Sequence, residues 1–223
     1  MGAVYPAPFP KYIIPAPNKV YLKGAELLLD QNKEEFLKIY KENIHRPGSD
    51  TLLEWLENSD FFTAPASTRF HGSYAGGLLE HSLNVYHCLQ REVHNHAMED
   101  EYTPETIAVS ALLHDVCKVN FYKQGFRNAK DENGKWYQKP VYEIDERFPC
   151  GHGEKSVIIL QSHMRLTENE IYAIRAHMGG FDTSVKGGDR FIGEIFERCP
   201  LSVLLHIADM KATYLVENSH VDK

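Results

Sequence analysis

The strongest chemical signal in the sequence is a histidine followed directly by an aspartate, His114-Asp115, in the segment LLHDVCK. The pair closes a run of apolar residues, where an ionised carboxylate would be costly to bury alone. A bound divalent cation would remove that cost, and imidazole together with carboxylate suits Mn²⁺, Fe²⁺, Zn²⁺ or Ni²⁺. A single His-Asp pair often arises by chance, so a metal site needs support from elsewhere in the chain.

Four further residues of the metal-ligating type are associated with segments of helical pattern. They are His81, on an apolar helical stripe; His152 in CGHGEKS and His177 in AIRAHMGG, both beside glycines; and Asp209, the single acid in LLHIADMKATYL. Taken one at a time, a histidine on an apolar face is more often a hydrogen-bonded core residue, and a buried aspartate is more often a cap or an ion-pair partner. The joint occurrence of all six residues favours metal binding.

These residues must be positioned by helices. Apolar periodicity predicts the main helices over about 77–93, 104–117, 167–178 and 200–217. Thr103 and Pro104 suit the N-cap and the first position of the second of these helices. Thr167 and Glu170 form the capping-box pair of the third.

The remaining segments surround this helical core. Residues 1–24 carry five prolines and are predicted to be extended, and helices follow over about 32–45 and from Ser49 or Asp50 to about residue 56. Asn133-Gly134, flanked by aromatic residues, predicts a small β-hairpin inserted in the helical domain. The predicted fold class is therefore all-α. We expect a Pro-rich segment with two short helices over 1–60 and a helical domain that carries the candidate metal site over 61–223.

Composition limits the classes of function. The net charge of −7 disfavours binding to long nucleic acid. No apolar stretch reaches the ~18 residues of a membrane span, and the N-terminus does not resemble a signal peptide. The four cysteines are far apart, which favours reduced thiols. We therefore expect a cytoplasmic protein without a membrane partner.

The order of His81, His114-Asp115 and Asp209 resembles that of the HD-domain superfamily, named for its His-Asp pair. Its members carry a His, a His-Asp pair and a distant Asp on different helices of an all-α bundle. Dinuclear members add two histidines before the last Asp, where His152 and His177 stand. HGSYAGGLLEHSLNV also resembles the segment before the first ligand in bacterial HD-domain 3′-to-5′ exoribonucleases. The resemblance covers about residues 65–215 and does not include the OB-fold module of those exoribonucleases.

The resemblance implies a phosphomonoesterase or phosphodiesterase that uses divalent metal ions, which could be Mn, Fe, Ni, Zn or Mg. It implies that His81, His114, Asp115 and Asp209 hold one ion. Asp115 would bridge to a second ion, held by the two intermediate histidines. Two ions about 3.5–4 Å apart would share a hydroxide and hold the phosphoryl oxygens during in-line attack.

Several residues near these ligands could act on a phosphorylated substrate. Asp115 and Lys118 are the expected catalytic residues; Lys118 faces the phosphate in family members, although a lysine at a helix C-terminus is also favoured by the helix dipole. Arg69 and His71 precede the first-ligand helix and could line the pocket. Lys123 and Arg127 belong to a basic stretch around the hairpin that could steer the substrate, or that could simply be a solvated loop.

Three functions remain open at this point. The first is a hydrolase of phosphate esters in nucleotides or related small molecules, which the acidic net charge favours. The second is a nuclease on short single-stranded RNA or DNA. The third is a metal- or nucleotide-binding regulatory module without turnover, and the presence of all six ligand-type residues disfavours it.

Overall fold

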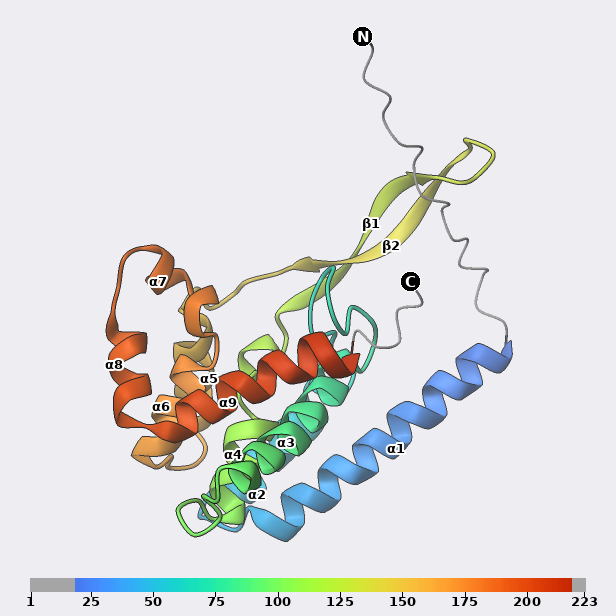
Figure 1. Cartoon of the computed structure of the whole chain (residues 1–223). Helices are drawn as coiled ribbons and strands as arrows, with labels where there is room; N and C mark the ends of the chain where they lie inside the picture. The colour runs from blue at the N-terminus through green and yellow to red at the C-terminus, as the bar shows by residue number, and fades with distance from the viewer. Residues whose placement is uncertain (1–18, 218–223) are drawn as a thin grey trace.

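The computed structural model describes residues 19–217, with side chains from residue 27 onward. It is mostly helical and contains one two-stranded antiparallel hairpin, which confirms the predicted all-α class (Figure 1). The helices are α1 (Lys19–Asn43), α2 (Ser49–Glu57), α3 (Gly77–Asn95), α4 (Pro104–Leu112), α5 (His152–Gln161), α6 (Glu168–Ala176), α7 (Thr183–Lys186), α8 (Phe191–Arg198) and α9 (Pro200–Lys211). Two 3₁₀-helices, η1 (Val116–Lys118) and η2 (Gly179–Phe181), and a π-helix, η3 (Ala212–Val216), complete the helical segments.

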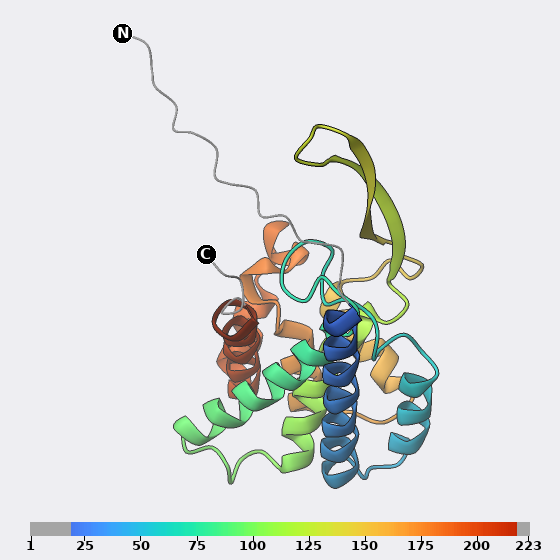
Figure 2. The same cartoon turned by 90° about the vertical axis from the view of Figure 1, so that its right-hand side faces the viewer.

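Helices α3 and α9 lie side by side (Figures 1 and 2). Helix α4 packs against α3, and α6 packs against α9. Each contributes fully buried apolar side chains to one core, such as Leu79, Leu112, Ile174 and Leu205. Burying a side chain of this size stabilises the fold by roughly 1.5–3 kcal/mol. The same packing brings together the polar residues that these helices carry.

The predicted start signals of two helices are confirmed. The side chain of Thr103 accepts a hydrogen bond from the backbone of Thr106, with Pro104 as the first residue of α4. Thr167 and Glu170 form a reciprocal capping box at the start of α6. These caps satisfy backbone N–H groups that the first turn of a helix leaves without partners.

Two predictions for the N-terminal part differ from the structure. Helix α1 begins at Lys19, so residues 19–24 are helical rather than extended; the prolines that argued for an extended chain all lie at or before Pro17. The rest of the predicted extended segment lies outside the described residues. Helix α2 has Gly48 as its N-cap, with no side-chain cap, because Ser49 is already within the helix. Gly48 has φ = 93°, and a Cβ there would lie 2.0 Å from the carbonyl oxygen of His163, so this close approach requires glycine.

The predicted end of one ligand-bearing helix also differs from the structure. Helix α4 ends at Leu112 rather than near Cys117, so the His-Asp pair lies in the turn that follows it. Helices α7 and α8 were not predicted. Within residues 19–217, no helix is both long and apolar enough to cross a membrane.

The predicted hairpin is present and projects away from the helical body (Figures 1 and 2). Its strands are β1 (Tyr122–Lys130) and β2 (Trp136–Ile144), paired from Tyr122 opposite Ile144 to Lys130 opposite Trp136. Gly134 has φ = 77° in the connecting turn, as expected for the Asn-Gly signal.

Candidate metal centre

The six residues predicted as metal ligands come from different parts of the fold and meet at one place. They are His81 on α3, His114 and Asp115 in the turn after α4, His152 at the first position of α5, His177 directly after α6, and Asp209 on α9. Because α3, α4, α6 and α9 form one core, side chains that are distant in the sequence converge here.

Asp115 lies at the centre of the cluster, and its two carboxylate oxygens face different histidines. Oδ1 lies 2.6 Å from Nε2 of His152 and 3.4 Å from Nε2 of His177. Oδ2 lies 3.5 Å from Nε2 of His114 and 3.7 Å from Nε2 of His81. A carboxylate with histidines on both sides is placed to contact two cations at once.

Asp209 extends the cluster on the side of His81. Its Oδ1 lies 3.3 Å from Nε2 of His81, which in turn lies 3.3 Å from Nε2 of His114. The ligand atoms of His81, His114 and Asp115 all lie within 4.8 Å of one another, as do those of His114, His177 and Asp209. Nitrogen and carboxylate oxygen at such spacing form a donor set that suits a first-row divalent cation.

Two of these histidines are held so that Nε2 points into the cluster. Nδ1 of His114 donates to the carbonyl oxygen of Ala111 at 2.8 Å, and Nδ1 of His177 donates to that of Ile174 at 2.6 Å. A neutral imidazole that donates through Nδ1 has a lone pair on Nε2. Nε2 of His177 is buried and has no hydrogen-bond partner among the described residues. Such an atom can coordinate a metal ion, so the residues fit one.

The electrostatics of the cluster also favour a cation. Burial raises the pKa of Asp115, but Lys118 and the surrounding histidines outweigh it and hold that pKa well below its ordinary range. Burial lowers the pKa of His81, but hydrogen bonds to Asp209 and Glu217 raise it to about 10. The buried Asp115 carboxylate and the partly buried Asp209 carboxylate are therefore stabilised by positive charge beside them, which a divalent cation would also provide.

His114 contrasts with His81, although the two rings are neighbours. Burial is the main cause that lowers the pKa of His114 to about 3, and the nearby His177 and His81 lower it further. His114 is therefore neutral at physiological pH, which is the form in which imidazole binds metals.

Lys118, predicted to contact phosphate, lies beside the cluster in η1. Its Nζ is 2.6 Å from Oδ2 of Asp115. Burial lowers the pKa of Lys118, but Asp115 outweighs it and the pKa is raised. The ammonium group is therefore fixed next to the candidate ligands and also lines the cleft described below.

A cleft of about 650 Å³ opens onto the cluster. Of the cluster, the side chains of His152 and Asp209 are partly exposed in this cleft, at 30% and 17%. Other lining residues are largely apolar or aromatic, including Phe70, Ile144, Met178, Phe181, Met210 and Tyr214. A concave apolar site with a few convergent polar groups is typical of a small-ligand site.

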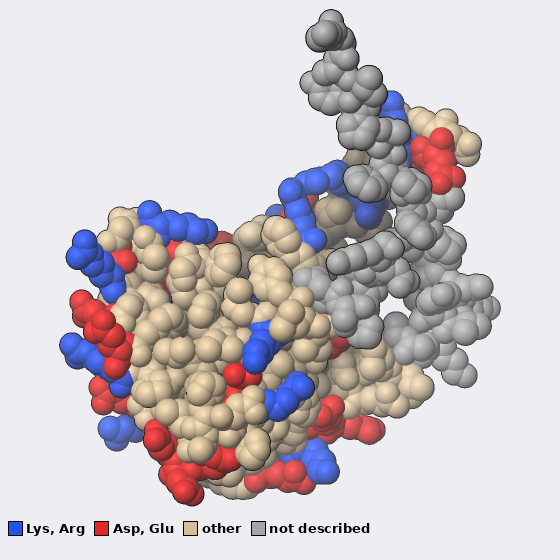
Figure 3. Space-filling model, viewed as in Figure 1, with Lys and Arg blue, Asp and Glu red and all other residues tan. Residues whose placement is uncertain are grey.

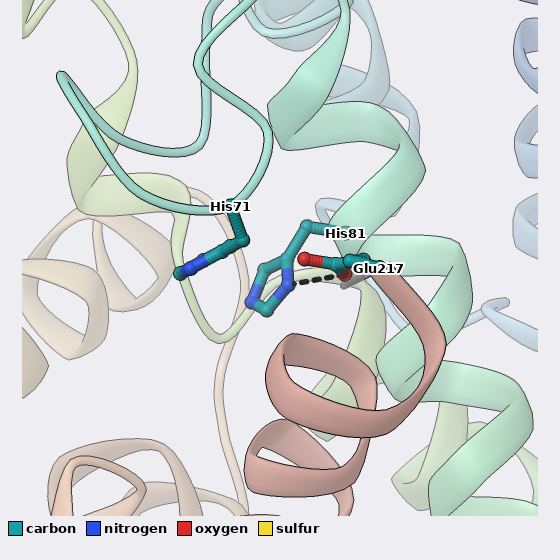
Figure 4. Close-up of side chains that lie close together, drawn as sticks. All are labelled: His71, His81 and Glu217. Carbon is teal, nitrogen blue, oxygen red and sulfur yellow. Dashed lines mark hydrogen bonds and ion pairs between the residues drawn. The ribbon is translucent and has the colours of Figure 1, made fainter. Parts of the chain in front are cut away.

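His71 lines this cleft, as predicted, whereas Arg69 does not. His71 lies in the loop before α3, and its ring lies beside that of His81, with ring centroids 4.9 Å apart (Figure 4). A Cβ on Gly77 would lie 2.0 Å from the carbonyl oxygen of Gly72, so glycine at the start of α3 lets this loop pack closely beside the cluster. Burial lowers the pKa of His71 to about 4. Arg69 is exposed and is not among the residues that line the cleft.

Lys123 and Arg127, the other predicted substrate-binding residues, lie on the hairpin and not in the cleft. Lys123 is exposed, and its Nζ lies 3.7 Å from Oδ1 of Asp145. Arg127 lies further along β1, opposite Lys139. Sequence proximity to Lys118 suggested that they belong to the pocket, but the hairpin carries them away from it.

Glu217 was not predicted, yet it contacts the cluster directly. Its Oε1 accepts a hydrogen bond from Nδ1 of His81 at 2.9 Å (Figure 4). It follows the π-helix η3, eight residues beyond Asp209. On a regular α-helix, eight residues make two full turns and about 80° more. A regular helix would therefore direct Glu217 away from the face that carries Asp209, which is why the sequence pattern did not indicate it.

A family model described as the HD domain matches residues 78–212. The matched range contains all six residues of the cluster together with Lys118. No curated protein and no solved structure matches the chain.

Proposed function

The chain belongs to the HD-domain family, which implies metal-dependent hydrolase activity, and on this premise we propose that it hydrolyses phosphate esters of nucleotides or related small molecules. The observation that carries this proposal is the buried Asp115 carboxylate, with histidines facing each of its oxygens and the Lys118 ammonium group beside it.

The donor set divides into two groups that share Asp115. His81, His114, Asp115 and Asp209 would hold one divalent ion, and Asp115, His152 and His177 would hold a second. Mn, Fe, Ni, Zn and Mg are the candidates. Bound divalent cations lower the pKa of water and polarise phosphoryl oxygens.

The protein side chains supply binding and orientation. Lys118 presents a compact positive charge beside the cluster, which suits a phosphoryl oxygen. Asp115 fixes the position of that ammonium group through the contact at 2.6 Å. The hydrogen bonds from Nδ1 of His114 and His177 keep the two Nε2 atoms directed at the reacting region.

The cleft supports a substrate with a planar aromatic part. Phe70, Phe181 and Tyr214 line it and are all at least half exposed, so they can stack on a base. Lys118 and Lys186 supply positive charge for phosphate. The acidic chain as a whole favours small substrates over long polymers, and a cytoplasmic location stays a prediction from the sequence.

The direct test is a comparison of the wild-type protein with Asp115→Ala. We expect about two metal ions per chain in the wild type by elemental analysis. With Mn²⁺, we expect hydrolysis of bis(p-nitrophenyl) phosphate and of members of a panel of mononucleotides, cyclic nucleotides and short oligonucleotides. The Asp115→Ala protein should lose this activity and keep its helical circular dichroism. Asp100→Ala, a change of an exposed acid in the loop after α3, is the matched control.

Persistence of activity in Asp115→Ala would contradict the proposed site. Release of mononucleotides from an oligomer, with free mononucleotides untouched, would favour the nuclease instead. The hairpin gives a specific reason to include oligomers in the panel.

A further inference from the structure

One face of the β1–β2 hairpin carries aromatic and amide side chains along its whole length. Directly paired residues of an antiparallel ladder lie on the same face, and alternate residues along each strand share that face. The observed register therefore defines this surface, which we call the aromatic face. It consists of Tyr122, Gln124, Phe126, Asn128 and Lys130 on β1 and Trp136, Gln138, Pro140, Tyr142 and Ile144 on β2.

The rings on the outer half of this face are in water. Phe126 is 65% exposed and Trp136 is 64% exposed. Nζ of Lys130 lies 4.7 Å from the centre of the Trp136 ring, which agrees with their placement on one face. Because the hairpin projects from the body (Figures 1 and 2), the helical core does not cover these rings. Exposed aromatic groups in a row are typical of a binding surface.

The charges on the hairpin favour an anionic partner. The aromatic face contains no acidic residue, and the opposite face carries Lys123, Arg127 and Lys139 against Glu143. Figure 3 shows basic side chains along the hairpin and acidic side chains gathered at its far end. Long basic side chains can reach around the edge of a two-stranded ribbon, so they can contact phosphates of a ligand on the aromatic face.

The aromatic face begins at the candidate active site. Its first pair, Tyr122 and Ile144, lines the same cleft as His81, Asp115 and Asp209. The hydroxyl of Tyr122 donates to the carbonyl oxygen of Ala66 at 3.2 Å, which fixes the base of the hairpin at the cleft. From there the face extends about 26 Å, at ~3.3 Å per residue of β1.

We propose that the aromatic face binds a short single-stranded nucleic acid by base stacking and directs one end of it into the cleft. Stacking on aromatic rings tolerates any base sequence, and the amides and Lys130 add polar contacts. At about 3.4 Å per stacked base, the face accommodates at most about eight nucleotides. The proposal rests on the proposed hydrolysis of phosphate esters and deepens it, because it adds short single strands to the substrates of the same cleft.

A second copy of the chain is the main competing occupant of an exposed aromatic surface. In a two-fold pairing the face would meet its own copy, so the basic side chains Lys123, Arg127 and Lys139 of the two hairpins would repel one another. It would also leave the cationic groups beside the aromatic face without a phosphate-like partner. A short nucleic acid satisfies both the rings and the positive charges.

The test measures binding directly, so its result does not depend on hydrolysis. The probes are fluorescein-labelled single-stranded oligomers of eight thymidine or eight uridine nucleotides, and the matching dinucleotides. Fluorescence anisotropy is recorded with chelator at low salt for the full-length wild type, for Phe126→Ala/Trp136→Ala and for Tyr137→Ala. Tyr137 is the matched control, because it is an exposed aromatic residue of β2 on the opposite face.

We expect the wild type to bind at least one of the two eight-nucleotide probes at least tenfold more tightly than its dinucleotide. Loss of two stacking rings should weaken binding by about 25-fold or more, at about fivefold per ring. Tyr137→Ala should bind as the wild type does. The DNA and RNA probes show which sugar is preferred.

Equal affinity for long and short probes, or unchanged binding in Phe126→Ala/Trp136→Ala, would overturn the inference. The inference would also be overturned if the double variant changed its oligomeric state in sedimentation but kept its probe binding. That result would assign the face to a second copy of the chain. Binding is measured with chelator and hydrolysis is measured separately with Mn²⁺, so an absence of hydrolysis would count against the proposed function and not against the aromatic face.

Discussion

Nδ1 of His81 donates a hydrogen bond to Oε1 of Glu217, so a carboxylate from the end of the last helix orients a ring that belongs to the candidate metal centre (Figure 4). Burial raises the pKa of Glu217, but contact with His81 outweighs it and holds that pKa below its ordinary value. The carboxylate is therefore ionised at neutral pH. A carboxylate behind a ligating histidine fixes the ring and increases its basicity.

Removing this carboxylate should weaken metal binding. For Glu217→Ala we expect the affinity for Mn²⁺ or Zn²⁺, measured by isothermal titration calorimetry, to fall by about 10–100-fold. Glu80→Ala is the control, because Glu80 on α3 accepts a hydrogen bond from Tyr74. Equal affinities of the Glu217→Ala and wild-type proteins would show that Glu217 does not act through His81.

Lys118 should affect turnover and metal affinity in opposite directions. Lys118→Met removes the positive charge that would lie beside the reacting phosphate. We therefore expect kcat/KM to fall by about 10²–10³. It also removes the ammonium group that contacts Asp115, so metal affinity should stay the same or rise. Lys118→Arg keeps the charge and should recover part of the activity. A loss of metal affinity in Lys118→Met would instead indicate a structural role.

Glu170 should contribute strongly to stability. It is fully buried, forms two hydrogen bonds with Arg46 at 2.6 and 2.8 Å, and completes the capping box of α6. Glu170→Ala leaves Arg46 without this partner, so we expect a loss of about 3–5 kcal/mol in the free energy of unfolding by urea. Glu168→Ala, in the exposed part of the same helical turn, should cost less than about 1 kcal/mol. Similar losses in both variants would contradict this assignment.

Asp182 should make stability depend on acidic pH. Burial raises its pKa, but hydrogen bonds from Ser184 and Arg175 outweigh it and hold the pKa below the ordinary value of 3.8. The ionised form is favoured by folding, so its contribution is full above pH 3.8 and is lost as the pH falls through the lowered pKa. Urea unfolding between pH 6 and pH 2.5 should show Asp182→Asn less stable at pH 6. The difference should shrink toward the acid end, and a constant difference would exclude this linkage.

The sequence identified the residues of the candidate site better than it identified the groups around them. Most of the six ligand-type residues are polar within an apolar, periodic stretch, and such a residue has few explanations other than a buried polar site. Arg69 carried no such pattern and lies on the surface. The positions of Lys123 and Arg127 depend on the direction of the hairpin, which an Asn-Gly turn does not determine.

Caps and turns were predictable because they depend on neighbouring residues, as at Thr103 and Thr167. The start of α1 was missed because a proline-rich segment was assumed to continue to residue 24. The contact between His81 and Glu217 depends on how α3 packs against α9 and on the helix geometry after Lys211. Neither is encoded in a local pattern.

The π-helix η3 has a consequence for how this chain tolerates changes in length. Its wide turn absorbs one additional residue, so Glu217 occupies the angular position that the seventh residue after Asp209 would take on a regular α-helix. That position lies about 20° around the helix axis from Asp209. Deleting one residue between 212 and 216 would therefore convert the bulge to ordinary helix and still deliver the carboxylate to His81. Inserting one more residue would rotate it away, so this turn should accept shortening but not lengthening.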